Sequence, residues 1–357
     1  MHSFYSTKAS AVAVLLFTAL PSLTMAATPK ASDYPAGWTA APANPEWTKA
    51  IGIQKVAQTD LYDWTGDVVA CPEKNQWGLT YDDGPTEHTN VVLDLLKANN
   101  VKATFFVVGS QVLQNPEILL RAYNEGHHIA LHTWSHGSLP KADMGVAIAE
   151  VVYNAMVVKQ VIGVTPSFIR PPYGEISRSV REMLKKLGLT ITMWNVDSRD
   201  GEGHGGHALS VFQEAMKTSR STGILSLQHD IHAEQTKYAA VTLEAIIKQG
   251  SFKPMPVAQC LGTPAYDESF WTKLGVPVPG ISGAKGTPLA PGTTVPTGPA
   301  PPSTTSPATT TGAGSGDAGQ KKPTTNGMSN DAVFPRLLLS LVCFRLWPLA
   351  SLQSRSE

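Results

Sequence analysis

Between about residues 75 and 260, short apolar runs alternate with segments in which apolar residues recur every three or four positions. The short runs are typical of buried strands, and the periodic segments are typical of helices with one apolar face. This alternation predicts a parallel sheet, because parallel strands need a crossover connection that is usually a helix. The predicted strands are Trp77–Tyr81, Ala103–Val108, His127–Leu131, Ser167–Arg170, Thr190–Val196, Ile224–Gln228 and Pro254–Ala258. The predicted helices are Asn90–Asn99, Ser110–Asn124, Ala142–Ile162, Ser177–Leu187, Ala208–Ser219 and Thr236–Gln249.

The order of these elements predicts one α/β domain over residues 75–262. A parallel (β/α) barrel of about seven units fits better than an open doubly wound sheet, because polar residues suited to chemistry follow several different strands. No Gly-x-Gly-x-x-Gly sequence follows the first strand, which argues against a dinucleotide site.

The N-terminal part of the chain lies outside this pattern. Residues 1–26 contain the short apolar run Ala11–Leu20 and a small-x-small motif, which predict a secretory signal peptide. A buried helix is the alternative for this run. Residues 27–74 have no clean period, and we expect an irregular segment that packs on the domain.

The C-terminal part changes in composition. Residues 279–326 are rich in Pro, Thr, Ser and Gly, which predicts a disordered stalk open to O-glycosylation. Residues 327–357 place small residues before a broken apolar tail, which predicts a propeptide for glycosylphosphatidylinositol (GPI) attachment. A free, soluble tail is the alternative.

Charge and cysteine content narrow the class of protein. The chain has 28 basic and 28 acidic residues, and this balance argues against a nucleic-acid partner or electrostatic membrane binding. Cys71 and Cys260 bracket the periodic region, and in a secreted protein a disulfide between them is the natural interpretation. Two free thiols are the alternative. Cys343 lies in the predicted propeptide, so cleavage would leave an even number of cysteines.

Two groups of polar residues that follow predicted strands suggest metal chemistry. Asp82 and Asp83 end the first strand, and His132 and His136 follow the third. One carboxylate and two imidazoles make a three-ligand zinc site with an open position for water. The second carboxylate is then available as a general base. A simple Asp-Gly-Pro turn and a chance pair of histidines are the alternatives.

Three further strand ends carry polar groups. Two prolines follow Arg170 and fix the backbone, so the amide of Tyr173 can act as an oxyanion donor; a rigid turn with a surface arginine is the alternative. His229 ends the sixth strand, where it can donate a proton to a leaving amine. Asp197 and Asp200 follow the fifth strand, where they can orient His229.

Five segments, taken in their order and spacing, resemble the motifs of the polysaccharide deacetylase family over about residues 75–250. They are Thr80–Pro85, His132–His136, Arg170–Gly174, Asp197–Asp200 and Leu225–Asp230. The resemblance implies a distorted (β/α) barrel and metal-dependent removal of N-acetyl groups from a polysaccharide. It therefore implies that residues 75–262 form the catalytic domain.

The resemblance also implies a role for each matching residue. Asp82 would be the catalytic base, and Arg170 would orient it. The metal, Zn²⁺ or Co²⁺ or another divalent transition metal, would be held by Asp83, His132 and His136.

The remaining implied roles concern the acetyl group and the leaving amine. His229 would be the acid, with Asp200 as its partner. The amide of Tyr173 would stabilise the oxyanion, and Leu227 would line the pocket for the acetyl methyl group. Tyr173 and Trp194 are also candidates for substrate binding.

One motif departs from the family pattern. Asp200 is followed by Gly201 where the family usually has tryptophan, so the aromatic wall of the acetyl pocket is missing or comes from elsewhere. His204 and His207 in the same Gly/His-rich loop could add a metal contact, and a flexible surface loop is the alternative.

These observations predict a secreted, monomeric, metal-dependent chitin deacetylase at the cell wall, held on the outer face of the plasma membrane by a GPI anchor. The partner would be chitin or its oligosaccharides, with no nucleic acid. Another acetylated polysaccharide, such as peptidoglycan or xylan, is the alternative substrate. A chitin-binding wall protein without catalysis is the alternative class.

Overall fold

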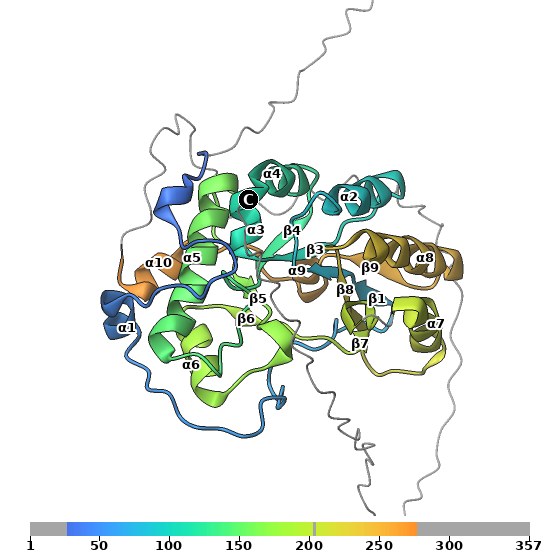
Figure 1. The fold of residues 1–357 in the computed structure, drawn as a ribbon. Coiled ribbons are helices and arrows are strands. Elements are labelled where there is room, and N and C mark those ends of the chain that lie inside the picture. The colour runs from blue at the N-terminus through green and yellow to red at the C-terminus, as the bar shows by residue number, and fades with distance from the viewer. Residues whose placement is uncertain (1–26, 203–204, 277–357) are drawn as a thin grey trace, which may run out of the picture. The chain divides into compact units, whose positions relative to one another are not determined.

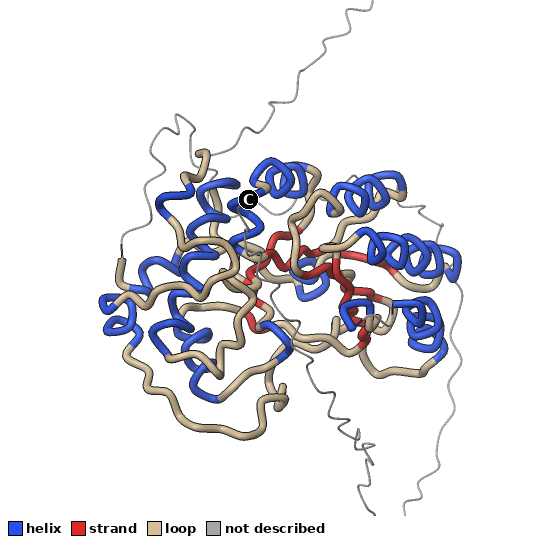
Figure 2. Tube along the Cα trace, viewed as in Figure 1, coloured by secondary structure: helices blue, strands red, loops and turns tan. Residues whose placement is uncertain are grey.

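Parallel strands lie at the centre of the fold and helices lie around them, as Figures 1 and 2 show for a computed structural model of the chain. The structure describes residues 27–202 and 205–276. The strands are β1 (Gln76–Gly78), β2 (Thr80–Asp82), β3 (Thr104–Val107), β4 (His128–Leu131), β5 (Phe168–Ile169), β6 (Thr190–Ile191), β7 (Val196–Asp197), β8 (Ile224–His229) and β9 (Lys253–Met255). The helices are α1 (Pro45–Ile51), α2 (Thr89–Ala98), α3 (Gly109–Gln114), α4 (Pro116–Asn124), α5 (Met144–Ile162), α6 (Arg178–Lys186), α7 (Ala208–Lys217), α8 (Ala233–Gln249), α9 (Val257–Leu261) and α10 (Ser269–Leu274).

The predicted α/β fold with a parallel sheet is confirmed. Several predictions fall outside the described residues: the signal peptide at 1–26, the stalk at 279–326, the GPI propeptide at 327–357, and the residues Cys343 and His204.

The strands close into a distorted barrel through one short stretch of chain. Strands β2, β3, β4, β5 and β6 pair in that order, and β8 pairs with both β2 and β7. Since β6 and β7 both belong to residues 190–197, this stretch joins β5 on one side to β8 on the other. Strand β1, just before β2, pairs with β8 and β9. The predicted strand Thr190–Val196 is therefore two short strands that bridge the two sides of the barrel.

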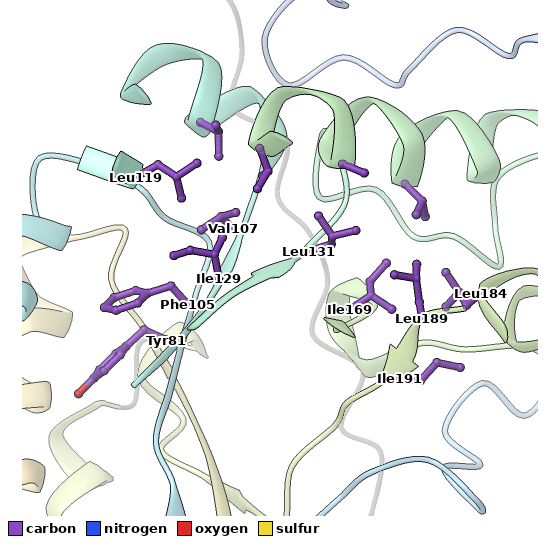
Figure 3. Close-up of a cluster of buried hydrophobic side chains, with 14 of the residues drawn as sticks. Tyr81, Phe105, Val107, Leu119, Ile129, Leu131, Ile169, Leu184, Leu189 and Ile191 are labelled. Carbon is purple, nitrogen blue, oxygen red and sulfur yellow. The ribbon is translucent and has the colours of Figure 1, made fainter. Parts of the chain in front are cut away.

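The two faces of the barrel strands carry different side chains, since neighbouring residues of a strand point to opposite sides. One face packs against the surrounding helices, and Figure 3 shows Phe105, Ile129 and Leu131 in this layer. The other face points inward, where a smaller apolar cluster includes Phe106, Ala130 and Phe168. Polar residues such as Arg170 share this interior, and its guanidinium lies 4.1 Å from the centre of the Phe106 ring.

Helix α5 is buried on most of its surface, and the N-terminal segment supplies part of the cover. The helix is long and apolar enough to cross a membrane, but 72% of its apolar stretch is buried within the fold, as in a core helix of a globular protein. Trp47 of α1 packs edge-on against Tyr153 of α5 at 5.3 Å. The ring of Tyr34 stacks on that of Trp134, which lies just after β4, with 5.5 Å between the ring centres. The segment that we predicted to be irregular therefore contains a helix and completes the core.

Proline explains two differences from the predicted elements. The predicted helix Ser110–Asn124 is two helices, because Pro116 has no N–H for the preceding turn and disfavours the helical conformation at Asn115. The predicted strand Pro254–Ala258 ends at Met255, and the chain after Pro256 turns into α9. There the amide of Val257 donates to the side chain of Thr104.

Two contacts hold the C-terminal end of the described region to the barrel. Cys71 and Cys260 form the expected disulfide, which connects the segment before β1 to α9. Helix α10 lies beyond the predicted domain boundary at residue 262, yet Trp271 is buried and its indole N–H donates to Thr165 at 2.8 Å. The packed fold thus extends to α10.

Candidate active site

The carboxyl ends of β2, β4, β5 and β8 meet at one edge of the barrel. The register pairs Asp82 directly with His229, and it pairs Leu131 with Ile169. Polar residues that immediately follow or end these strands are thereby brought together although they are far apart in the sequence. This placement is where barrel proteins carry their active sites.

Strained backbone conformations gather at this edge. Six residues other than glycine have positive φ among those that the structure describes, and five of them lie in loops after barrel strands: Asp83, Thr133, His136, Tyr173 and Arg199. Such a conformation costs on the order of 1–3 kcal/mol and persists only when the surrounding structure holds it. At Asp83 (φ 78°) it redirects the chain directly after Asp82.

Asp83, His132 and His136 form a cluster suited to a metal ion. Their ligand atoms all lie within 4.8 Å of one another, and Asp83 Oδ1 is 3.3 Å from the Nε2 atom of each histidine. The carbonyl of Arg170 lies 2.6 Å from His132 Nδ1 and so accepts its proton, which leaves His132 Nε2 as an acceptor. Asp83 Oδ1 is buried without a hydrogen-bond donor. Acceptor atoms that converge in this way fit a divalent cation.

The protonation of this cluster also suits a metal. Burial lowers the pKa of His136 to about 4, and the neighbouring His132 lowers it as well, so its ring is neutral at pH 7. Burial alone would raise the pKa of Asp83, but the positive charge that the two histidines carry when they are protonated at low pH outweighs this effect and lowers it. The side chains of Asp83 and His136 keep 16% and 19% of their surface exposed, which leaves one side of the cluster accessible.

Asp82 is held by a buried arginine. Arg170 has no exposed surface, and its Nη1 donates to Asp82 Oδ1 at 2.6 Å and to Thr80 Oγ1 at 2.8 Å. Burial raises the pKa of Asp82, and the charge of Arg170 opposes this rise. The other carboxylate oxygen lies 3.7 Å from His132 Nε2. One oxygen is therefore fixed while the other faces the candidate metal cluster, and Arg170 is not a surface residue.

Across the site, His229 is tied to Asp200. His229 Nδ1 lies 2.7 Å from Asp200 Oδ1, and its backbone amide donates to Asp200 Oδ2 at 2.9 Å. Burial alone would lower the pKa of the imidazole, but the hydrogen bond to Asp200 and nearby carboxylates raise it to about 9. The carboxylate of Asp197 instead accepts a hydrogen bond from the backbone amide of Arg199. Of the two aspartates, only Asp200 reaches His229.

A close steric contact explains why glycine stands at position 201, where the family usually has tryptophan. A β-carbon added to Gly201 would come within 2.7 Å of Cε1 of the His229 ring. In this arrangement the backbone lies directly against the imidazole, so no larger residue fits at position 201 without a shift. His207 in the same loop is exposed, and among the described residues the candidate metal cluster comprises Asp83, His132 and His136 only.

The remaining predicted residues lie around these groups. Tyr173 has φ 61° within the short turn Pro172–Gly174, and its ring lies 4.6 Å from that of His136. A β-carbon on Gly174 would contact both Trp194 and Trp64, at 2.9 and 2.8 Å. Leu227 is buried on β8, two residues before His229 and thus on the same face of the strand.

Three residues that we did not predict support the site. Asp230 accepts from the amide of Gly84, next to Asp83, and burial raises its pKa to about 7. Glu150 is buried on α5 and accepts from the amide and hydroxyl of Ser135, between the two histidines. Trp64 donates its indole N–H to the carbonyl of Gly174 at 2.9 Å. Glu150 could have been found from the sequence, because it is a single acid in the apolar pattern of α5. No feature of the sequence marked Trp64.

Comparisons with known proteins agree with this geometry. Chitin deacetylase 1 of Cryptococcus neoformans var. grubii is 34% identical over 254 residues, which cover 65% of this chain and 54% of that protein. A chitin deacetylase of Pestalotiopsis sp is 35% identical over 214 residues, covering 58% of this chain and 70% of that protein. The solved structure of a chitin deacetylase from Colletotrichum lindemuthianum has a TM-score of 0.54 at 25% identity, covering 58% of this chain and 97% of that structure. The chain spans about half the length of the Cryptococcus relative.

The fold and the position of the polar cluster define a barrel-type protein with its candidate active site at the carboxyl ends of the strands. The family model for polysaccharide deacetylases matches residues 70–192, which include Asp82, the two histidines and Arg170. Together with the extent of the Pestalotiopsis match, this places the protein plainly: the chain belongs to the polysaccharide deacetylase family.

Proposed function

We propose that this protein hydrolyses the N-acetyl groups of N-acetylglucosamine units in chitin, releasing acetate and leaving chitosan. One observation carries the proposal: three different kinds of group converge at one edge of the barrel. They are a carboxylate held by a buried arginine, a cluster of metal-ligating acceptors, and an imidazole hydrogen-bonded to a carboxylate. Hydrolysis of an amide needs a base for water, an electrophilic group for the carbonyl oxygen and an acid for the amine.

The proposed roles follow from the contacts of each residue. Asp82 accepts the proton of the attacking water, since its free oxygen faces the cluster while Arg170 holds the other. Asp83, His132 and His136 hold a divalent metal, which when bound polarises the acetyl carbonyl and lowers the pKa of water.

The departing amine and the developing oxyanion need further groups. His229 is protonated at neutral pH because its pKa is raised to about 9, so it can donate a proton to the amine. The amide of Tyr173, fixed by the turn between two prolines and Gly174, donates to the oxyanion. Leu227 and Trp194 border the space for the acetyl group.

Substrate, metal and location complete the proposal. Chitin is supported by the names of the Cryptococcus, Pestalotiopsis and Colletotrichum relatives. A set of two imidazoles and one carboxylate suits Zn²⁺, and Co²⁺ also binds such donors. We further propose that the protein is secreted and GPI-anchored at the cell wall, which is supported by the apolar run at residues 11–20 and by the small residues and apolar tail of residues 327–357.

Acetate release from chitin oligosaccharides by the full chain tests the proposal. Activity should stop with a chelator and return with Zn²⁺. Asp82→Asn should abolish acetate release while Zn²⁺ still binds in calorimetry, and the exposed Asp94→Asn serves as a matched control. Full activity of Asp82→Asn would contradict its role as base. Release from acetylated peptidoglycan or xylan, but not from chitin, would correct the substrate.

A further inference from the structure

Trp64 contacts the turn that carries Tyr173, although the two residues are far apart in the sequence. Trp64 belongs to the N-terminal segment and precedes residues 70–192, which match the family model. Its indole N–H donates to the carbonyl of Gly174 at 2.9 Å, and its ring centre lies 4.9 Å from that of Trp194. One side chain from outside the matched region therefore touches both the turn and the aromatic residue beside it.

The turn itself has a strained backbone. Tyr173 and Gly174 have φ of 61° and 67°, both in the left-handed region. This conformation is unfavourable for tyrosine and persists only where the surrounding structure holds it. Pro171 and Pro172 restrict the backbone before Tyr173. The hydrogen bond from Trp64 restrains the backbone after it.

The space around Gly174 leaves the turn little freedom to move. A β-carbon added to Gly174 would lie 2.8 Å from the ring of Trp64 and 2.9 Å from that of Trp194, so both rings pack closely on the glycine. The ring centre of Trp194 is also 5.5 Å from the guanidinium of Arg170, which holds Asp82. Removal of the Trp64 ring would therefore open space beside the turn and beside Trp194.

The backbone around Trp64 is fixed to the barrel on both sides. Before Trp64, the carbonyl of Leu61 accepts from the amide of Ile176 at 2.8 Å. After it, the amide of Val68 donates to the carbonyl of Ile191, in β6, at 3.0 Å. The indole N–H is thus presented to the turn from a backbone that is itself held in place.

We propose that Trp64 is a positioning residue: by holding the carbonyl of Gly174, it keeps the amide of Tyr173 in the direction that stabilisation of the oxyanion requires. This inference rests on the proposed function, in which that amide donates to the oxyanion. A donor contributes to catalysis when it is already aimed at the place where charge develops, so a restraint on a strained turn affects the rate. Trp64 acts through Gly174 and needs no contact with the substrate.

The kinetics of Trp64→Phe in the full chain test this role. Phenylalanine keeps an aromatic ring beside Trp194 and removes the N–H that holds Gly174. We expect kcat for chitin oligosaccharides to fall about tenfold, less than the roughly hundredfold loss on deleting an oxyanion donor. KM should change by less than about twofold, because the donor acts in the transition state. Trp64→Ala also removes the ring and should lower kcat further. Trp38→Phe changes an exposed tryptophan of the same segment and should keep the wild-type kcat.

Two measurements without turnover separate positioning from general damage. Hydrogen exchange, followed by mass spectrometry, should be faster at residues 173–176 in Trp64→Phe than in the wild type. The affinity for Zn²⁺ in calorimetry should be unchanged, since Asp83, His132 and His136 lie in other loops.

These results also distinguish the proposal from the proposed function. If the wild type releases no acetate while Trp64→Phe still speeds exchange at residues 173–176, the proposed function fails and the restraint of the turn by Trp64 stands. An unchanged kcat in an active Trp64→Phe, unchanged exchange at residues 173–176, or a fall in Zn²⁺ affinity as large as the fall in kcat would each overturn the role of Trp64.

Discussion

Replacing Arg170 by methionine should leave a buried carboxylate without its partner. Arg170 has no exposed surface, and Asp82 is 2% exposed. The guanidinium donates to Asp82 and Thr80, and also to the carbonyls of Thr192 and Met193 at 3.2 and 3.0 Å. Methionine fills much of the same space and donates none of these hydrogen bonds.

The expected loss in the free energy of unfolding is about 3–5 kcal/mol at neutral pH, the usual cost of breaking a buried ion pair by removing one partner. Most of this cost comes from the unpaired carboxylate. A double variant, Arg170→Met with Asp82→Leu, removes both charges and should recover a large part of the loss. The comparison distinguishes electrostatic destabilisation from poor packing.

The loss should also depend on pH. Burial raises the pKa of Asp82, and without Arg170 this pKa rises further. A carboxyl group whose pKa is higher in the folded chain than in the unfolded chain binds a proton more tightly in the folded chain. The free energy of unfolding therefore falls as the pH rises above 3.8, the ordinary pKa of an aspartate. Arg170→Met should therefore lose less stability at pH 5 than at pH 8.

Urea unfolding of both variants with a chelator present, at the two pH values, measures these differences without a contribution from bound metal. An Arg170→Met variant that unfolds at the same midpoint as the wild type would contradict the expected loss. A double variant no more stable than Arg170→Met, or an equal loss at both pH values, would contradict its electrostatic origin.

Three further changes have defined outcomes. Asp200→Asn removes the hydrogen bond that raises the pKa of His229 to about 9, so the basic limb of the kcat/KM profile should move to lower pH; an unmoved limb would contradict the acid role. The raised pKa of His229 also stabilises the folded chain, fully below pH 6.5, and this contribution is lost as the pH rises through 9. In urea unfolding, Asp200→Asn should therefore show much less of this pH-dependent loss than the wild type. Replacing Cys71 and Cys260 together by serine opens a loop with a sequence separation of 189, so the free energy of unfolding should fall by up to about 5 kcal/mol, and reduced wild type should match the variant. Burial lowers the pKa of His128 to about 3, so the wild type loses stability as the pH falls from 6.5 to 3, and His128→Leu should lose less over that range.

Local patterns in the sequence were sufficient to predict the strands and helices and the positions of the candidate catalytic residues along the chain. The period of apolar residues reports which face of a strand or helix is buried, so the order of strands and helices could be predicted. Polar residues at strand ends could be grouped because parallel strands end at one edge. The proximity of Asp82, Asp83, His132 and His229 is seen in the structure, while their catalytic roles stay predictions.

Only the tertiary structure decided which distant segments complete the site. The closure of the barrel depends on a break between β6 and β7 that no local signal marked. The contacts of Trp64 with Gly174, of Glu150 with Ser135, and of Gly201 with His229 depend on the paths of loops across the barrel. The physical reason is that periodicity records burial along one element. The partner that buries an element is chosen by long-range packing, and this choice leaves no regular trace in a single sequence.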